Sequence, residues 1–151
     1  AVDVVKPEVV PRDPTARPLR LDNEPDEINS DGIQVYLGLP GEDAVGLLIV
    51  PSTDSGALTA RGISGTAGTP EMVQGCWQTT ESGYRITAAI SPPGWDAVRR
   101  GEAIGFDLLV NEMHSDRLRR AGQLVWSGGG GWVWLRGDQQ DPARFGTLEL
   151  R

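Results

Sequence analysis

Three of the five tryptophans lie close together, between residues 126 and 134, and one of them follows a run of glycines. Trp132 comes directly after the tract 128–131, in which every residue is glycine. Such a tract packs a core poorly, but it can present an indole ring at the rim of a sheet. A flat, partly exposed indole matches the apolar face of a sugar ring, and that contact is worth on the order of 1 kcal/mol. We therefore predict that Trp132 contacts a ligand and that Trp126, beside Leu124 and Val125, belongs to the core.

Residues that commonly carry catalysis are sparse in this chain. It has one histidine, His114, and one cysteine, Cys76, so no disulfide within the chain and no cysteine-based zinc site can form. His114 lies in a charged stretch that is typical of a solvated loop. The sequence contains no nucleophile elbow, phosphate-binding loop or dinucleotide fingerprint. A glycosidase pair of carboxylates stays open, because its spacing is a three-dimensional quantity, but nothing distinguishes Glu102, Glu112 or Glu149. The sequence predicts a protein that is not an enzyme.

The charge balance bears on possible partners. The chain has 14 Lys and Arg residues against 21 Asp and Glu residues, which gives a formal net charge of −7. A net anion is repelled by phosphate backbones, so nucleic acid is excluded as the main partner. The hydrophobic content of 38% is too high for a disordered chain, and it is too interrupted for a membrane span. We expect no nucleic-acid partner and no insertion into a membrane.

Short strands must position the side chains that could bind a ligand. Apolar and polar residues alternate with a period of two along several segments, which is typical of strands with one buried face. The 20 glycines and 11 prolines predict many turns, with a long proline-rich loop over residues 6–31 and one helical turn near residues 95–100. The predicted strands cover residues 1–5, 32–37, 47–50, 57–61, 73–79, 84–90, 104–111, 123–126, 132–135 and 147–150. This pattern predicts an all-β fold, an antiparallel β-sandwich with jelly-roll-like or immunoglobulin-like layers and at most one short helix.

Four polar residues fall on the strand faces opposite the apolar ones. Gln34, Arg85, Asp107 and Asn111 each alternate with apolar neighbours in their predicted strands. They are therefore candidates for a single polar surface, although the outward residues of any sandwich would show the same pattern.

Four segments, in order and at suitable spacing, resemble the blocks of carbohydrate-binding module family 9 and its DOMON-like relatives. The segments are Ser-Asp-Gly-Ile-Gln-Val-Tyr-Leu at 30–37, Gly-Tyr-Arg-Ile-Thr-Ala-Ala-Ile at 83–90, Ile-Gly-Phe-Asp-Leu-Leu-Val-Asn at 104–111 and Arg-Phe-Gly-Thr-Leu-Glu-Leu at 144–150. The resemblance implies a β-sandwich whose concave sheet holds a glycan between two tryptophans. It implies that Trp132 is one of these indoles, that Asn111 is a sheet amide near the sugar, and that Arg85 is a basic partner of a sugar hydroxyl. Gln34 lies in the same predicted surface.

The chain departs from the family pattern at two positions. Ile28 stands where the family usually carries its other tryptophan, and Gln34 stands where the family usually carries a carboxylate. Trp77 or Trp95 would have to replace the missing indole. The resemblance also implies that a structural calcium is possible, held by oxygen ligands without an EF-hand spacing. Its candidate ligands are Asp22, Asp26, Asp31, Asp138 and Asp141.

These observations lead to one domain over residues 1–151, excised from a larger protein or lacking the family's first strands. The leading interpretation is non-catalytic binding of a polysaccharide or oligosaccharide, which would position a larger secreted, periplasmic or cell-surface protein on a glycan. One alternative is a structural or interaction sandwich that has lost its sugar site. Another is a haem-binding electron-transfer domain, in which His114 would need Met72 as its partner, because Met113 is adjacent to His114 and cannot face it across the ring.

Overall fold

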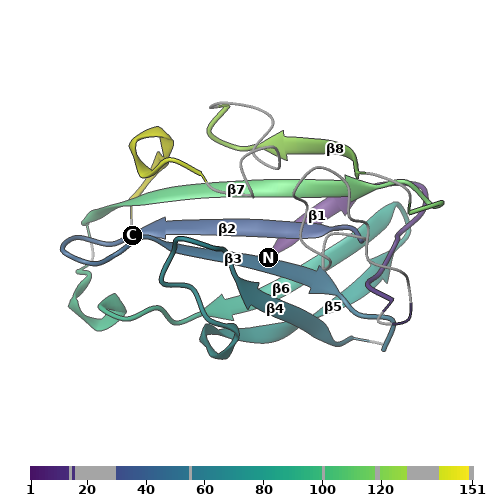
Figure 1. The fold of residues 1–151 in the computed structure, drawn as a ribbon, viewed down its shortest axis with the longest axis horizontal. Coiled ribbons are helices and arrows are strands. Elements are labelled where there is room, and N and C mark those ends of the chain that lie inside the picture. Colours follow the sequence, from purple (N-terminus) through teal and green to yellow (C-terminus); the bar gives the residue numbers. More distant parts are fainter. Residues whose placement is uncertain are drawn as a thin grey trace.

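A computed structural model shows two antiparallel β-sheets packed face to face (Figure 1). It describes residues 1–13, 15, 30–54, 56–99, 101–117, 120–128 and 140–149. The larger sheet has the strand order β4-β3-β2-β7-β8, and the smaller sheet has the order β1-β6-β5. Strand β9 also belongs to the larger sheet, because it pairs with β7 beyond the end of β8. The predicted all-β antiparallel sandwich is confirmed.

The strands follow the predicted alternation closely. The larger sheet is built from β2 (Gly32–Gly38), β3 (Val45–Pro51), β4 (Leu58–Gly62), β7 (Ala103–Met113), β8 (Arg120–Val125) and β9 (Gly146–Glu149). The smaller sheet is built from β1 (Val2–Val5), β5 (Val73–Thr80) and β6 (Gly83–Ile90). The predicted strand at 132–135 lies outside the described residues.

Helical structure in the described part of the chain is limited to short 3-10 turns. These are η2 (Pro70–Met72), η3 (Trp95–Ala97) and η5 (Pro142–Arg144), and η3 lies where the sequence predicts a helical turn. Within the described residues, no helix has the length and apolar character needed to cross a membrane.

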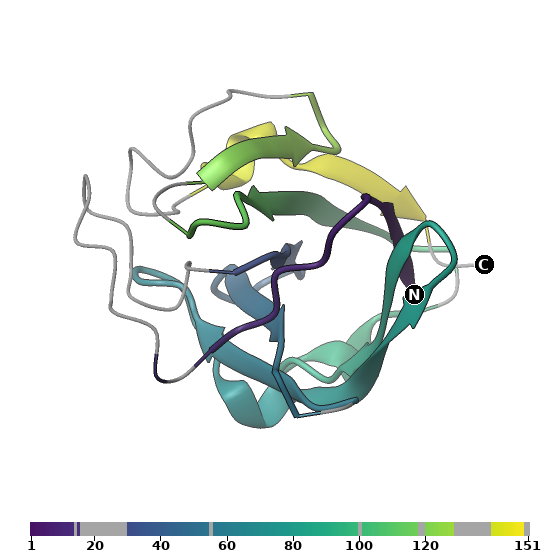
Figure 2. The same cartoon turned by 90° about the vertical axis from the view of Figure 1, so that its right-hand side faces the viewer.

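The main core lies between the two sheets. Alternate residues of β2, namely Ile33, Val35 and Leu37, pack in one apolar cluster with Tyr84 and Ile86 of β6. Complete burial of an aliphatic side chain of this size contributes about 1.5–3 kcal/mol to folding. Figure 2, which views the molecule from one end, shows the sheets curving around this shared interior.

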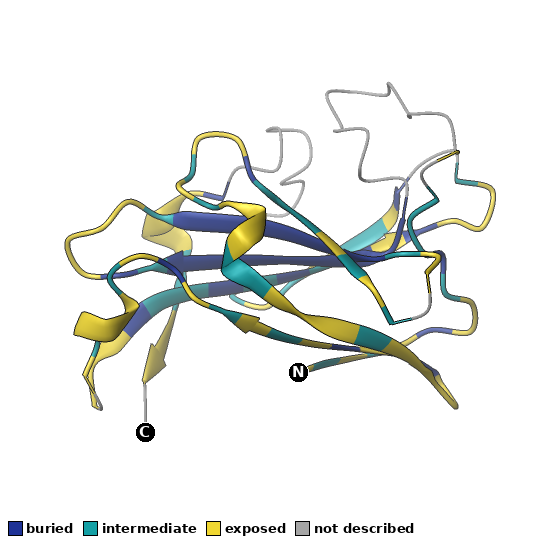
Figure 3. Ribbon diagram, turned by 90° about the horizontal axis from the view of Figure 1, so that it is seen from below, coloured by how far each residue is buried: buried dark blue, intermediate teal, exposed yellow. Residues whose placement is uncertain are grey.

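The larger sheet is also buried on its other face, which we call the outer face. Tyr36, Leu48 and Leu109 form a second apolar cluster there, and Val10 and Phe145 pack against them from outside the sheet. As a result, every residue of β3 is buried, as the doubly apolar sequence at 47–50 predicts. In Figure 3 the dark blue of buried residues is concentrated in the central strands.

A buried ion pair fastens the amino-terminal segment to the larger sheet. Lys6 Nζ lies 2.6 Å from Asp31 Oδ1, and Asp31 is completely buried. Asp31 also accepts hydrogen bonds from Met113 N and Val10 N, both at 2.8 Å, while Lys6 Nζ donates to Met113 O at 2.8 Å. One carboxylate therefore joins the chain before β2, the end of β7 and the segment that follows β1.

The two sheets are joined along one side of the sandwich and open along the other. On the joined side, Trp77 of β5 donates from its backbone N–H to Gly56 O and from Nε1 to Ser52 O, each at 3.1 Å. On the open side, a hollow of about 450 Å³ lies between the edge strands β1 and β8. Tyr84 lines this hollow, and its hydroxyl, although buried, has no hydrogen-bond partner among the described residues.

Replacing Asp31 by Ala should remove the central acceptor of the buried network and leave the Lys6 ammonium uncompensated. Removal of one partner from a buried ion pair costs about 3–5 kcal/mol, so the free energy of unfolding should fall by that amount. Urea denaturation followed by circular dichroism measures it. Asp3→Ala is the matched control, because its ion pair with Arg85 is exposed on both sides. Equal effects of the two substitutions would contradict the assignment.

Replacing Tyr84 by Phe should leave stability at pH 7 nearly unchanged, because the hydroxyl that is lost has no partner among the described residues. Burial, together with the charges of Asp31 and Glu112, raises the pKa of Tyr84. Above pH 10 the unfolded tyrosine ionises while the folded one stays neutral, so wild-type stability should fall relative to the variant by about 1.4 kcal/mol per pH unit. Denaturant midpoints between pH 9 and pH 11 test this, and parallel curves would refute it.

Candidate functional site

Three amide side chains meet on the outer face of the larger sheet. Gln34 comes from β2, Asn111 from β7 and Gln123 from β8, and Asn111 is the direct register partner of Gln123. Gln123 Nε2 donates to Asn111 Oδ1 at 2.7 Å and more weakly to Gln34 Oε1 at 3.4 Å. Tyr36 OH also reaches Gln34 Oε1 at 3.4 Å. We call Gln34, Asn111 and Gln123 the amide cluster.

The amide cluster keeps unused hydrogen-bonding capacity. Gln34 Nε2, Asn111 Nδ2 and Gln123 Oε1 are buried and have no hydrogen-bond partner among the described residues. Leaving a buried donor or acceptor unsatisfied costs about 1–3 kcal/mol, so such groups in a folded protein call for an explanation. The cluster offers two donors and one acceptor, a set that suits hydroxyl groups because a hydroxyl both donates and accepts.

Asp107 lies on the same face but is fully engaged by protein groups. Its carboxylate accepts from Ser127 N at 3.0 Å, from Ser127 Oγ at 2.8 Å and from Gln140 Nε2 at 2.7 Å. It also accepts from Leu108 N at 2.9 Å. Asp107 therefore fastens two segments of chain to the sheet and is not a free carboxylate.

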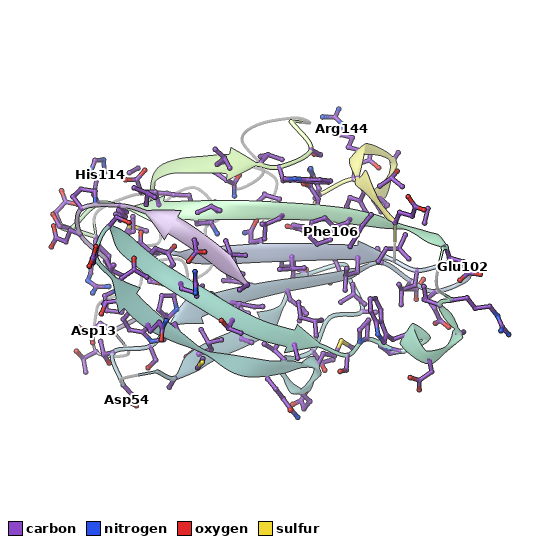
Figure 4. The ribbon with its side chains drawn as sticks, turned by 180° about the vertical axis from the view of Figure 1, so that it is seen from behind. Asp13, Asp54, Glu102, Phe106, His114 and Arg144 are labelled. Carbon is purple, nitrogen blue, oxygen red and sulfur yellow. The ribbon has the colours of Figure 1, made fainter. Side chains whose placement is uncertain are left out.

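A hollow of about 370 Å³ lies at one end of the outer face. The rings of Tyr36 and Phe145 line it, with centroids 5.8 Å apart and planes inclined at 47°. Thr66 and Gln140 add polar groups to its wall. Its volume falls within the range of about 300–1,000 Å³ found for small-molecule pockets. Arg144 is at its rim, on the same side of the molecule as β8 (Figure 4).

The structure places three of the four predicted polar residues on one face and separates the fourth. Gln34, Asp107 and Asn111 share the outer face of the larger sheet. Arg85 lies on β6 of the smaller sheet, where its guanidinium binds Asp3 at 2.6 and 2.8 Å and lowers the pKa of that carboxyl. The prediction of one surface that includes Arg85 is wrong. The polar faces of two packed sheets point away from each other, and alternation along a strand does not reveal to which sheet the strand belongs.

The structure describes Trp77, Trp95 and Trp126, and the burial of Trp126 differs from the prediction. Trp132 and Ile28 lie outside the described residues. Trp126, predicted to be a core residue, is 51% exposed and stands edge-on to Phe106 with ring centroids 5.3 Å apart. Trp77 packs against the core between the sheets, so it cannot supply a second indole on the outer face. Trp95 begins η3, in the connection between β6 and β7.

The described residues give little support to a metal site. No group of three or more His, Cys, Asp or Glu side chains gathers in the described ranges. Both oxygens of Asp31 are engaged by Lys6 and backbone amides, and Asp141 accepts from Ala143 N at the start of η5. Asp31 therefore does not fit the role of a calcium ligand, whereas the hydrogen bond of Asp141 engages only its Oδ1. Asp22, Asp26 and Asp138 lie outside the described residues, so a calcium site that uses them stays a prediction.

The residues proposed for haem ligation are not brought together. Met72 packs against the core between the sheets, and Met113 is buried in the cluster on the outer face. His114 is exposed in the turn after β7, at one end of the molecule (Figure 4). Axial ligands must face one another across a single pocket, so these positions do not favour that alternative.

Sequence reasoning missed Gln123 as a member of the site. The segment 120–125 shows no strict alternation that would place Gln123 on the same face as Gln34 and Asn111, and its contacts with Asn111 and Gln34 span 12 and 89 residues. Only the pairing of β8 with β7 brings the three amides together.

Comparisons with known proteins identify the fold. No protein-family model and no curated protein sequence matches this chain. Among solved structures, it is similar to a carbohydrate-binding module family 9 from Caldicellulosiruptor kristjanssonii in complex with glucose, with a TM-score of 0.59 and 18% identity over 95% of this chain and 66% of the other. The same kind of module in complex with cellotriose gives a TM-score of 0.60 and 18% identity, over 95% and 65% of the two chains. This chain thus spans about two thirds of the length of those structures. Its β-sandwich has a fold like that of carbohydrate-binding module family 9.

Proposed function

We propose that this protein binds an oligosaccharide or polysaccharide, without catalysing a reaction on it, over the amide cluster on the outer face of the larger sheet. The observation that carries the proposal is the unused hydrogen-bonding capacity of Gln34, Asn111 and Gln123 in a buried setting. The similar fold in complex with glucose and with cellotriose supports it. The proposal further assigns the protein to the secreted, periplasmic or cell-surface space, where it would position a larger protein on a glycan.

The chemistry of the amide cluster suits a neutral sugar. The amide hydrogens of Gln34 and Asn111 can donate to hydroxyl oxygens, and Gln123 Oε1 can accept from a hydroxyl, provided that the entry of the sugar uncovers these buried atoms. Such bonds are stronger in a partly desolvated site than in water. The formal charge of −7 disfavours an acidic glycan, because like charges repel. Trp132 would add an apolar contact to one face of the ring.

The buried carboxylates already accept hydrogen bonds from protein groups, which supports a binding role over a catalytic one. Asp107 and Asp31 are the buried carboxylates of the described residues, and both hold protein groups. Glu102 is exposed and accepts from Arg99 N. A glycosidase needs two carboxyl groups that are free to act on one bond.

A second candidate is a structural or interaction sandwich that has lost its sugar site. It is favoured by Gln34, which stands where the resemblance implies a carboxylate, and by Ile28, which stands where it implies an indole. Under this candidate, water would satisfy the amide cluster and no sugar would bind.

Isothermal titration with glucose and cellotriose, extended by a glycan array, decides between the two candidates. We expect saturable binding of at least one sugar at millimolar or lower concentration. Absence of binding to every sugar tested, by a protein shown to be folded, would contradict the proposed function and favour the second candidate.

Asn111→Ala and Trp132→Ala should each weaken sugar binding by about five-fold or more, since each removes a proposed contact worth on the order of 1 kcal/mol or more. Titration with the best-bound sugar gives the dissociation constants. Trp95→Ala is the matched control for the loss of an indole, because Trp95 precedes the start of β7 whereas Asn111 lies near its end, so Trp95 is not the missing second indole over the amide cluster. Equal affinity of all variants would place the binding site elsewhere.

A further inference from the structure

The hollow on the open side of the sandwich is separate from the proposed sugar site. Its volume of about 450 Å³ is within the range of about 300–1,000 Å³ found for small-molecule pockets. Val4 of β1, Tyr84 of β6 and Val110 of β7 line it, and all three take part in the core between the sheets. Asn111 and Gln123 also border it, but the side chains of the amide cluster are directed to the other face of the larger sheet.

The Tyr84 hydroxyl is a buried polar group of this hollow that nothing in the described chain binds. Tyr84 is 1% exposed, and its hydroxyl has no hydrogen-bond partner among the described residues. Burial and the charges of Asp31 and Glu112 raise the pKa of Tyr84. Asp31 directly precedes β2 and Glu112 is near the end of β7, so the hydroxyl is on the side of β6 that faces the larger sheet. A buried hydroxyl without a partner calls for an explanation, and a ligand in the hollow would supply one.

Glu112 brings a carboxylate to the same hollow. It is exposed, and within the described ranges no hydrogen bond or ion pair engages it. Its register partner on β8 is Gly122, and Glu112 Oε2 lies 3.7 Å from the place that a Cβ atom would take there. Because Gly122 has no side chain, this carboxylate oxygen stays uncovered on the side of β8.

The charges around the hollow leave one negative group without a counterion. Asp3 is paired with Arg85 at 2.6 Å, and Lys6 is paired with Asp31 at the same distance. Among the described residues that line the hollow, Glu112 is therefore the carboxylate whose charge no cation balances. A cationic ligand is attracted to such a group, and the formal net charge of −7 acts in the same direction.

The rest of the wall suits an aliphatic group. Val4, Val110 and Leu124 contribute apolar surface on the side that faces the interior. Leu124 is 67% exposed, and exposed side chains change rotamer readily, so its movement can open a path to the Tyr84 hydroxyl. A ligand that covered Leu124 and Val110 would remove apolar surface from water, which favours binding.

We propose that this hollow binds a small primary ammonium ion with an aliphatic body. The ammonium group donates to the Glu112 carboxylate and to the Tyr84 hydroxyl oxygen, while the aliphatic part lies along Val4, Val110 and Leu124. An ammonium group has three donors and no acceptor, which suits two oxygen acceptors. An anionic ligand would be repelled by Glu112, and a neutral alcohol would gain nothing from its charge. The inference goes beyond the proposed function and does not rest on it.

The test is a titration of 15N-labelled protein with hexylammonium chloride at pH 7, followed through the backbone amide signals of β1 and β8. Hexanol and sodium hexanoate serve as the neutral and anionic probes of equal chain length. We expect saturable shifts at Val5, Gly122 and Leu124 with hexylammonium at millimolar concentration, and none with hexanoate. Hexylammonium should bind about three-fold or more tightly than hexanol, a modest factor because ion pairs with an exposed carboxylate are weak.

Two variants test the two oxygen acceptors. Glu112→Gln should lower the affinity for hexylammonium to about that for hexanol, because it removes the charge and keeps the shape. Tyr84→Phe should also weaken hexylammonium binding, while its stability at pH 7 stays close to that of the wild type. Glu102→Gln is the matched control, because Glu102 is an exposed carboxylate before the start of β7, at the opposite end of the molecule from His114, which follows the end of β7 (Figure 4).

Three results would overturn the inference. The first is the absence of hexylammonium binding at β1 and β8, with shifts confined to another surface or missing altogether. The second is equal affinity for hexylammonium and hexanol. The third is full hexylammonium affinity in folded Glu112→Gln or Tyr84→Phe. None of these results depends on whether cellotriose binds, so the inference and the proposed function can fail separately.

Discussion

A sheet that is buried on both faces can carry polar side chains only where each of them has a hydrogen-bond or ion-pair partner. This constraint applies to the larger sheet. Its outer face combines an apolar cluster around Tyr36 and Leu109 with buried carboxylates and amides. Asp31 meets the constraint with the Lys6 ammonium and two backbone amides. Asp107 meets it with four neutral donors. The amide cluster meets it only in part within the described residues, and this difference is the basis for proposing that these amides bind a ligand.

The carboxylates of Asp31 and Asp107 fix different segments of the chain to the outer face. Asp31 binds groups that are 21 to 82 residues away from it in sequence, at the end of the sheet where β2 begins and β7 ends. Asp107 lies nearer the start of β7, and it accepts hydrogen bonds from Ser127 and Gln140. Between them lie Gln34, Asn111 and Gln123, whose positions are set by strand register and not by any loop. The backbone under the proposed binding surface is fixed by three paired strands before a ligand arrives, which favours affinity because little backbone order has to be created.

Period-two alternation was enough to predict most strands and the faces of Gln34, Asp107 and Asn111, because side-chain direction in a strand is a local property. It could not assign Arg85 to the smaller sheet, since that depends on which strands pair. The prediction that Trp126 is a core residue, made from its neighbours Leu124 and Val125, is also wrong. β8 is the edge strand of its sheet, so apolar residues at and after its end, such as Leu124 and Trp126, are left largely exposed. The roles of Lys6, Gln123 and Gln140 rest on contacts across 12 to 107 residues, which no local pattern encodes.

The central claim is that a sugar is held by the amide cluster, and side-chain amide resonances report on it directly. In 15N-labelled protein, the NH₂ signals of Gln34, Asn111 and Gln123 can be assigned by substituting each residue in turn and followed during titration with cellotriose. The account predicts that all three shift together, saturate, and give one dissociation constant that agrees with calorimetry. If cellotriose binds while these three signals stay fixed and signals from another surface move, the sugar site is elsewhere and the account is wrong.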